Sequence, residues 1–181
     1  PLGFLNSGGL ISVAEETNQA NNTVLAGNVI KMWQRLYAPY RRAAVWYISP
    51  DIETELARLT LVGRNASGNT STFPTSMVYV PPGGASGSPY GTLMGRPVIV
   101  TQHCSAIGDV GDICLCAMNK YICAVKAGGV QSSSSMHLWF DQDTTAFKFR
   151  MRVDGQPELD SPITPRAGST TMSAFVTVAA R

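Results

Sequence analysis

The sequence has few charged residues and lacks any long apolar run. Asp, Glu, Lys and Arg make up only 14% of the 181 residues, whereas an average soluble domain has about 25%. No stretch approaches the roughly 18 consecutive apolar residues that cross a bilayer, so a membrane protein is excluded. With 44% hydrophobic residues and a net charge of +2, intrinsic disorder is excluded as well. Much of the surface must therefore be neutral, which suits packing against neighbours.

The four cysteines are too close together in sequence to connect distant parts of the fold. Cys104, Cys114, Cys116 and Cys123 fall within one 20-residue stretch, so reduced, mostly buried thiols are expected. A zinc site with His103 as a further ligand is the alternative, but the C-x-C spacing departs from the usual C-x₂₋₄-C. We therefore expect neither a metal nor another cofactor.

Helical periodicity is confined to two segments. Apolar residues recur in two adjoining stripes over residues 24–37, which predicts a helix about 21 Å long that is buried over more than half of its girth. Ser49-Pro50-Asp51 supplies an N-cap, a proline and an acidic residue, so a second helix is expected over residues 50–60. Residues 63–75 and 81–92 are rich in Gly, Ser, Thr, Asn and Pro and are predicted to be loops.

The other apolar segments are short and predict strands. They lie at residues 43–48, 77–80, 97–101, 113–118, 121–125, 136–140, 146–153 and 172–179. Few helices and many strands make the fold class α+β.

The clearest alternation of the sequence lies in its last third. One strand face would carry Phe147, Phe149, Met151 and Val153, and the other Lys148, Arg150 and Arg152. Asp141-Gln142-Asp143 precedes this strand and Asp154-Gly155 follows it, and both are turn signals. Residues 136–153 therefore predict a long antiparallel hairpin with a turn at Asp154-Gly155.

One polar cluster offers an enzymatic alternative. Ser105 with His103 and either Asp109 or Asp112 could supply a nucleophile, a base and an orienting acid. Both acids lie on the glycine-punctuated turn 108–112, which is more typical of a solvated connection between strands. The sequence also contains no Walker A, G-x-G-x-x-G or H-E-x-x-H motif. We expect no enzyme, and a hydrolase around His103 is the remote alternative.

Basic residues form a stripe and a pair. The stripe is Lys148, Arg150 and Arg152, and the pair is Arg41 and Arg42. Weak contact with phosphate groups is one interpretation, although the small net charge does not support a nucleic-acid recognition module. The other interpretation is pairing, within or between subunits, with the acids Glu15, Glu16, Glu158 or Asp160.

Several short segments share their order and spacing with a known family. They are residues 1–6 (PLGFLN), 43–50 (AAVWYISP), 93–98 (LMGRPV), 111–113 (GDI), 119–121 (NKY), 140–143 (FDQD), 146–147 (AF) and 152–155 (RVDG). Together they cover nearly the whole chain, which resembles the C-terminal portion of the HK97-type phage major capsid protein family.

The resemblance implies an HK97-like capsid fold in four segments. Residues 1–48 would begin the peripheral (P) domain and include a long spine helix at about 24–37. Residues 49–127 would form the axial (A) domain of mixed sheet and short helices. Residues 128–168 would form the P-domain β arm, and residues 169–181 a strand that returns to the A domain.

The implied function is mechanical. The chain would be a head subunit of a tailed phage or prophage, which forms the pentamers and hexamers of an icosahedral shell around double-stranded DNA. It would assemble in the bacterial cytoplasm with portal and scaffolding proteins and make weak, nonspecific contact with the packaged DNA. A shell of the same fold that encloses protein cargo, as encapsulins do, is the alternative.

Subunit contacts are expected in the glycine-rich loops and at the basic and turn positions. The candidate residues are Arg41, Arg42, Gly83, Gly84, Arg150, Arg152, Asp154 and Gly155. The N-terminal arm and the E loop of the family would precede Pro1. The chain also starts without Met and without a signal peptide, so we expect a piece of a longer protein that does not close shells by itself.

Overall fold

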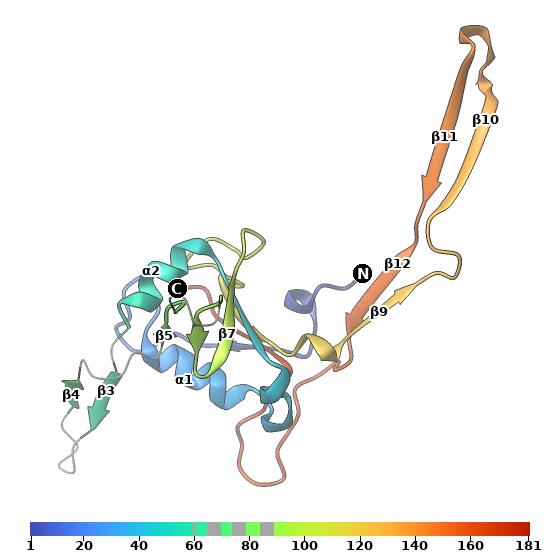
Figure 1. The fold of residues 1–181 in the computed structure, drawn as a ribbon. Coiled ribbons are helices and arrows are strands. Elements are labelled where there is room, and N and C mark those ends of the chain that lie inside the picture. Colours follow the sequence, from blue (N-terminus) through green and yellow to red (C-terminus); the bar gives the residue numbers. More distant parts are fainter. Residues whose placement is uncertain (60, 65–69, 74–78, 84–88) are drawn as a thin grey trace.

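The protein consists of a compact body and a long projecting arm (Figure 1). The computed structural model describes all residues except 60, 65–69, 74–78 and 84–88, and it describes only the backbone of residues 61–64 and 70–73. The arm is the ribbon from Tyr121 to Pro157, and the body is the rest of the chain. Mixed α/β content with few helices agrees with the expected α+β class.

The body is built on a mixed seven-stranded sheet. In spatial order its strands are β1 (Leu10–Val13), β13 (Phe175–Val178), β8 (Ile113–Cys116), β2 (Val45–Ile48), β7 (Arg96–Val100), β6 (Thr92–Leu93) and β5 (Tyr79–Val80). The β1–β13 and β2–β7 pairs are parallel, and the other pairs are antiparallel. The two ends of the chain thus meet in one sheet, although β1 had no counterpart among the predicted strands.

The central strands β8 and β13 are buried over their whole length, which explains why all of their residues except Thr177 are apolar. One face of the sheet carries the larger core, in which the helices also take part. The other face packs Cys114, Cys116 and Phe175 under Phe4, whose ring stacks on Phe175 at 5.5 Å.

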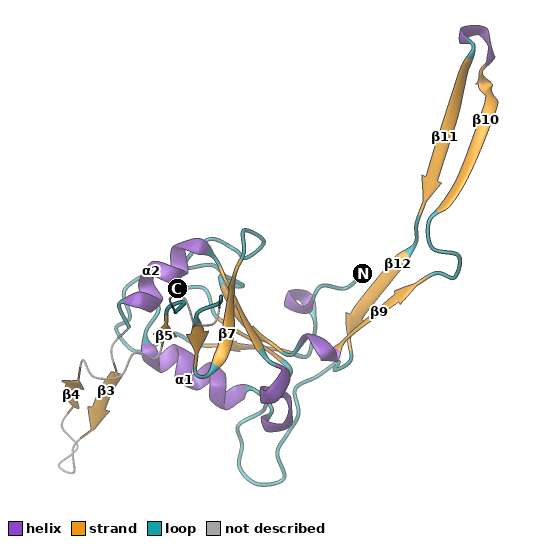
Figure 2. Ribbon diagram, viewed as in Figure 1, coloured by secondary structure: helices purple, strands orange, loops and turns teal. Residues whose placement is uncertain are grey.

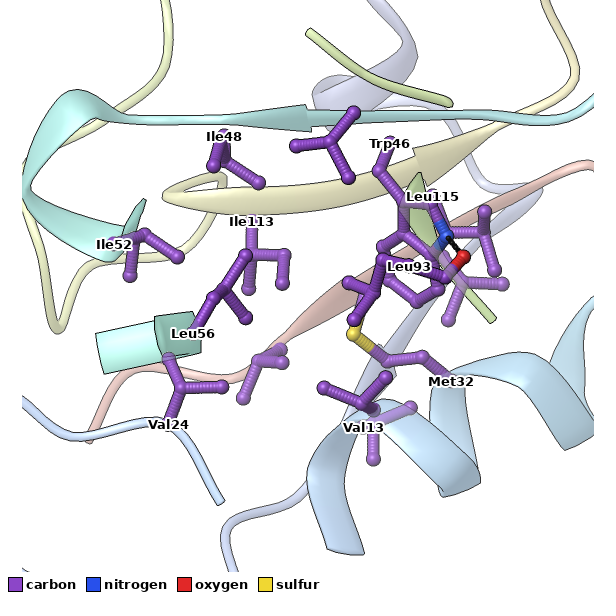
Figure 3. Close-up of a cluster of buried hydrophobic side chains, with 14 of the residues drawn as sticks. Val13, Val24, Met32, Trp46, Ile48, Ile52, Leu56, Leu93, Ile113 and Leu115 are labelled. Atoms are coloured by element: carbon purple, nitrogen blue, oxygen red, sulfur yellow. Dashed lines mark hydrogen bonds between the residues drawn. The ribbon is translucent and has the colours of Figure 1, made fainter. Parts of the chain in front are cut away.

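Trp46 belongs to the larger core and is fully buried in it. Figure 3 shows it at one end of the cluster, beside Leu93, Leu115 and Met32. The indole N–H donates a hydrogen bond of 2.9 Å to the Leu93 carbonyl, so its polar atom is satisfied inside the core.

The two helices, α1 (Ala26–Arg35) and α2 (Pro50–Ala57), contribute Val29, Met32, Ile52 and Leu56 to the same core. The expected spine helix over 24–37 is therefore wrong in its length, because ten residues span only about 15 Å. Its burial is also overestimated, since Ile30 is 44% exposed.

Both ends of α1 have a local cause. At the first turn the Asn28 side chain accepts the Leu25 N–H at 2.9 Å, which starts the helix at Ala26. At the other end Ser173 donates to the Arg35 carbonyl and accepts the Tyr37 N–H, both at 3.0 Å. This bridge to a distant segment extends the backbone at Leu36, so the helical pattern ends before the sequence suggests.

The arm has two parts, each a pair of antiparallel strands (Figure 2). Near the body, β9 (Tyr121–Val125) pairs with β12 (Val153–Pro157), and farther out β10 (Gln131–Trp139) pairs with β11 (Thr144–Arg150). The predicted strand 121–125 is confirmed, and the predicted hairpin exists with different limits. The expected turn at Asp154-Gly155 is wrong, because both residues lie inside β12 opposite Ala124 and Cys123.

Smaller elements complete the chain. They are the paired strands β3 (Leu61–Arg64) and β4 (Thr70–Phe73), and the 3₁₀ helices η1 (Phe4–Asn6), η2 (Ala38–Ala43), η3 (Met118–Lys120) and η4 (Phe140–Gln142). The strands overlap the expected loop 63–75, so that prediction is wrong at residues 63–64 and 70–73. Among the described residues, no helix has the length and apolar character required to cross a membrane.

Candidate assembly surface

The exposed apolar side chains of this protein are concentrated on and beside the arm. Of the twenty large hydrophobic residues exposed in the described part of the chain, twelve lie between Met118 and Val153. Phe147 and Phe149 are 71% and 70% exposed, and Phe140 at the tip is 79% exposed. Contiguous exposed apolar surface of this kind marks an interaction site.

The outer ribbon of β10 and β11 has two chemically different faces. Phe147 and Phe149 share a face with the residues directly opposite, Ser134 and Ser132. We call these four residues the aromatic face. The serines are too small to cover the rings, which explains why both phenylalanines remain exposed.

The opposite face is basic. Lys148 and Arg150 alternate with the phenylalanines, and Ser133 and Gln131 lie directly opposite them. The predicted alternation on β11 is thus confirmed up to Arg150. It does not continue into Arg152, because the ladder breaks after Arg150 and β12 begins at Val153.

The break between the two parts of the arm adds further cations. Lys126 donates its backbone N–H to the Arg152 carbonyl at 3.0 Å, which brings these residues together. A shallow hollow there is lined by Lys126, Ala127, Gly129, Gln131, Arg150 and Arg152. We call the four cations Lys126, Lys148, Arg150 and Arg152 the basic joint. In the part of the chain that the structure describes, none of them forms an ion pair.

The tip of the arm carries the opposite charge. The short helix η4 contains Asp141, and Asp143 follows it in a left-handed conformation with φ of 48°. Asp143 also lines a hollow with Met136, His137, Phe140, Thr144 and Thr145. We call the segment from Phe140 to Asp143 the acidic tip. Both aspartates are exposed, and no ion pair within the described residues involves them.

Asp154 and Gly155, two of the expected contact residues, lie where the arm joins the body. A Cβ on Gly155 would come within 2.8 Å of the Tyr121 ring, so only glycine fits under that ring. The Gly155 carbonyl accepts the Leu2 N–H at 2.7 Å, and the Tyr121 hydroxyl donates to the Leu2 carbonyl at 2.9 Å. The N–H of Gly155 donates to the Asp154 carboxylate, and this hydrogen bond lowers the pKa of Asp154. Within the chain, this site holds the N-terminal segment.

The other expected contact residues are scattered over the body. Arg41 donates to the Trp33 carbonyl at 3.0 Å and lies 5.1 Å from the centre of the Trp33 ring, so it serves the fold. Arg42 and Gly83 are exposed, and Gly84 lies outside the described residues. In Figure 1 the arm projects away from the body.

The expected pairing of the basic stripe with acids of the same chain is wrong. Glu16 pairs with Lys31 at 2.8 Å, and Glu158 pairs with Lys120 at 2.9 Å. Both acids thus pair with lysines outside the arm. Among the described residues, the stripe of Lys148, Arg150 and Arg152 has no ion-pair partner.

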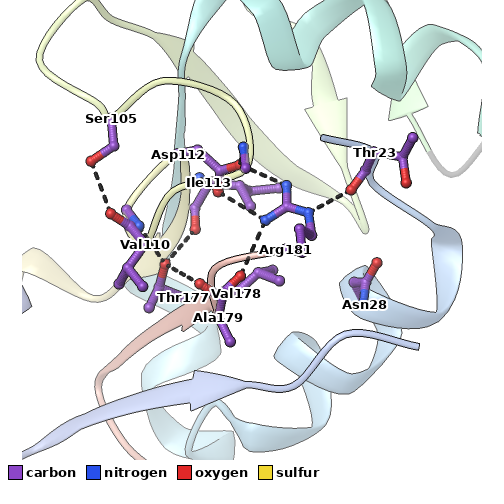
Figure 4. A network of polar contacts seen from close by, with 12 residues as sticks. Thr23, Asn28, Ser105, Val110, Asp112, Ile113, Thr177, Val178, Ala179 and Arg181 are labelled. Carbon is purple, nitrogen blue, oxygen red and sulfur yellow. Dashed lines mark hydrogen bonds and ion pairs between the residues drawn. The ribbon is translucent and has the colours of Figure 1, made fainter. Parts of the chain in front are cut away.

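The residues of the hydrolase alternative are not assembled into a catalytic group, and Figure 4 shows the contacts of two of them, Ser105 and Asp112. Ser105 donates to the Val110 carbonyl at 2.8 Å, and Asp112 forms a fully buried ion pair with Arg181 at 2.6 Å. Asp112 also accepts the backbone N–H groups of Gly108 and Ile113. Within the described residues no hydrogen bond joins the His103 side chain to Ser105, Asp109 or Asp112. The network therefore stabilises the turn 108–112 and the end of the chain.

The cysteines are free, as expected, and only two of them are buried. Burial raises the pKa of Cys116 well above its ordinary value and that of Cys104 to about 11, so both remain protonated thiols at neutral pH. Cys104 is half-buried, and Cys123 is exposed in the arm. In the part of the chain that the structure describes, no three His, Cys, Asp or Glu side chains gather to hold a metal ion.

Solved capsid structures share this fold. The capsid of an empty GTA particle, computed with C5 symmetry, matches 99% of this chain with a TM-score of 0.55 and 16% identity. The capsid of a native GTA particle, also computed with C5 symmetry, matches 94% of it with a TM-score of 0.51 and 16% identity. This chain spans 57% and 53% of those two chains, respectively. The likeness defines a capsid fold of mixed α/β content with few helices.

A family model narrows the class further. The model described as the phage capsid family matches residues 1–166, so the chain belongs to the phage capsid family. The resemblance seen in the sequence is confirmed by this match. No curated protein matches the chain.

Proposed function

We propose that this chain is a structural subunit of a phage-type capsid and that its arm attaches it to neighbouring copies. The observation that carries the proposal is the gathering of exposed apolar side chains on a two-stranded ribbon. Family membership and the shared fold support the same function.

Such a ribbon is only marginally stable in water. Two antiparallel strands alone bury little surface, so they need further packing to be stable. Burial of a phenylalanine side chain contributes about 1.5–3 kcal/mol, and Phe147 and Phe149 retain most of their accessible surface. Covering the aromatic face by a neighbouring subunit would provide this free energy during assembly.

The finer features of the function follow from the family resemblance. We propose closed symmetric shells with five- and sixfold capsomers, since identical subunits with complementary surfaces form closed point groups. Double-stranded DNA as contents, a tailed phage or prophage as source, and portal and scaffolding proteins as partners belong to the same proposal. So does assembly in the bacterial cytoplasm. A non-enzymatic function is supported by the commitment of Ser105 and Asp112 to structural contacts.

The division into P and A domains is also a proposal. Residues 128–168 hold the outer hairpin, and residues 169–181 bring β13 into the sheet beside β8. These positions are compatible with a P-domain arm and a returning strand.

The test compares the solution mass of the unchanged chain with that of Phe147→Ser/Phe149→Ser by light scattering over a range of concentration. Ile30→Gln serves as the control, because Ile30 is an exposed apolar residue of the body. We expect the unchanged chain and the control to associate with rising concentration and the double variant to remain monomeric, with the same thermal unfolding midpoint for all three. Equal association of the double variant would refute the arm as the attachment.

A further inference from the structure

We propose that the acidic tip of one arm docks on the basic joint of the arm of a second copy of this chain. The inference rests on the proposed function and specifies which segments meet. Asp141 and Asp143 of one subunit would pair with Lys126, Arg150 and Arg152 of its neighbour.

The charges of the acidic tip and of the basic joint cannot pair with each other within one molecule. Asp143 precedes Arg150 by seven residues on an extended strand, which separates them by about 23 Å. The tip and the joint are thus held at opposite ends of the same hairpin, and no ion pair within the described residues connects them. A contact between two molecules brings them together.

The two surfaces complement each other in charge and in polarity. The joint offers four cations with the polar side chains Gln131, Ser132 and Ser133 in the hollows beside them. The tip offers two carboxylates next to Phe140, the most exposed large apolar side chain of the described residues. Opposite charges of this kind fix the register of an interface more than they raise its affinity.

The contact is directional, since a tip meets a joint and not another tip. Repetition of such a head-to-tail contact produces a closed ring when the rotation between subunits closes. It would also place neighbouring arms across one another and leave the aromatic face, on the other side of the ribbon, open to a further contact.

A phosphate backbone is the competing ligand for four cations. The net charge of +2 is small for a protein that binds a polyanion. The joint also lies on the same ribbon as Phe147 and Phe149, which the charged exterior of a duplex would not cover. A protein neighbour can supply both carboxylates for the cations and apolar surface for the phenylalanines. A protein carboxylate is therefore the better ligand for the basic joint.

The experiment exchanges the charges. The joint variant is Arg150→Glu/Arg152→Glu, and the tip variant is Asp141→Lys/Asp143→Asn, because Asn tolerates the left-handed backbone at that position. A third chain carries all four changes. Arg58→Glu/Arg166→Glu is the matched control, since both of these arginines are exposed outside the arm.

Association of each chain is measured by sedimentation at low and high ionic strength. We expect the joint and tip variants to dissociate about tenfold more readily than the unchanged chain, and the four-change chain to regain most of its association. The control should associate like the unchanged chain, and salt should weaken every association that depends on the pair.

The other outcomes separate this inference from the proposed function. If the joint and tip variants associate normally while Phe147→Ser/Phe149→Ser does not, the tip-to-joint contact is overturned and the proposed function stands. Failure of the four-change chain to regain association also overturns the pairing. Binding of double-stranded DNA that the joint variant loses, with association unchanged, would overturn it in favour of phosphate. If the unchanged chain does not associate at any concentration, the result would count against both proposals.

Discussion

The buried ion pair between Asp112 and Arg181 provides a strong test of how the body is stabilised. Both side chains are fully buried, and the two guanidinium nitrogens contact the two carboxylate oxygens at 2.6 and 3.3 Å. Asp112 accepts two backbone N–H groups as well, at 3.0 Å from Gly108 and 2.7 Å from Ile113. Arg181 also donates to the Thr23 and Ala179 carbonyls (Figure 4).

The variant Asp112→Asn keeps the shape of the side chain and removes its charge. It leaves the Arg181 guanidinium buried without a counterion, which costs about 3–5 kcal/mol when one partner of such a pair is removed. This loss is a large fraction of the roughly 5–15 kcal/mol that stabilises a typical domain. In Asp112→Asn/Arg181→Met neither charge remains, so the combined loss should be smaller than the sum of the two single losses.

The measurement is chemical denaturation followed by circular dichroism, with Asp109→Asn as the control. Asp109 lies on the same turn but is exposed, so its variant should change the free energy of unfolding by less than about 0.5 kcal/mol. A loss below about 1 kcal/mol for Asp112→Asn, or strictly additive losses in the double variant, would show that the ion pair does not stabilise the body in this way.

Three further predictions concern single side chains. Burial and the hydrogen bond to Glu53 raise the pKa of Tyr79 to about 12. The stability that Tyr79 contributes should therefore be complete below pH 10 and disappear as the pH rises toward 12. Absorbance at 295 nm should show late ionisation of Tyr79 and of Tyr47, whose pKa burial also raises, and ionisation of all six tyrosines together near pH 10 would contradict this. Trp46→Phe removes the donor to the buried Leu93 carbonyl and should lower the free energy of unfolding by about 1–3 kcal/mol, whereas the same change at the exposed Trp139 should have little effect by the same denaturation assay. Gly155→Val places its side chain against the Tyr121 ring and should accelerate hydrogen exchange in β9 and β12 but not in β8 or β13; equal acceleration in all four strands would argue against a local effect.

The sequence predicted best those elements whose structure depends on local burial or a local cap. Residues 113–116 and 175–178 predict strands because both faces of β8 and β13 are buried, which selects apolar residues at every position except Thr177, whose hydroxyl donates to the Ile113 carbonyl. The cap and proline at Ser49-Pro50 placed the start of α2 correctly for a similar local reason.

The errors arose where contacts with segments far away in the sequence determine the structure. The end of α1 depends on Ser173, which no local pattern reveals. Four consecutive serines, residues 132–135, have no strand signature, yet the pairing with β11 extends β10 through them. Asp154-Gly155 is a turn signal in isolation, but the Tyr121 ring covers the glycine and keeps it in β12.

The candidate assembly surface was predictable in part. Alternation on β11 indicated the basic stripe and the aromatic residues opposite it. Lys126 lies beside that stripe because its backbone N–H donates to the Arg152 carbonyl. The two residues are too far apart in sequence for a local pattern to indicate this contact. The pair of Asp112 and Arg181 lies 69 residues apart in sequence and carried no signal beyond the two charges themselves.

The route of the chain through the arm has a consequence for how such proteins diversify. The chain leaves the sheet after β8 and re-enters it at β13, and these strands are direct neighbours, with the Ala117 N–H donating to the Ala174 carbonyl at 2.9 Å. The arm is therefore an insertion whose two ends are fastened together inside the sheet, and the entropy cost of closing such a loop grows only slowly with its length. Adding two residues to each of its outer strands would lengthen it by about 7 Å and leave both faces in phase. The reach between neighbours can thus change over evolution while the body keeps its sheet and its core.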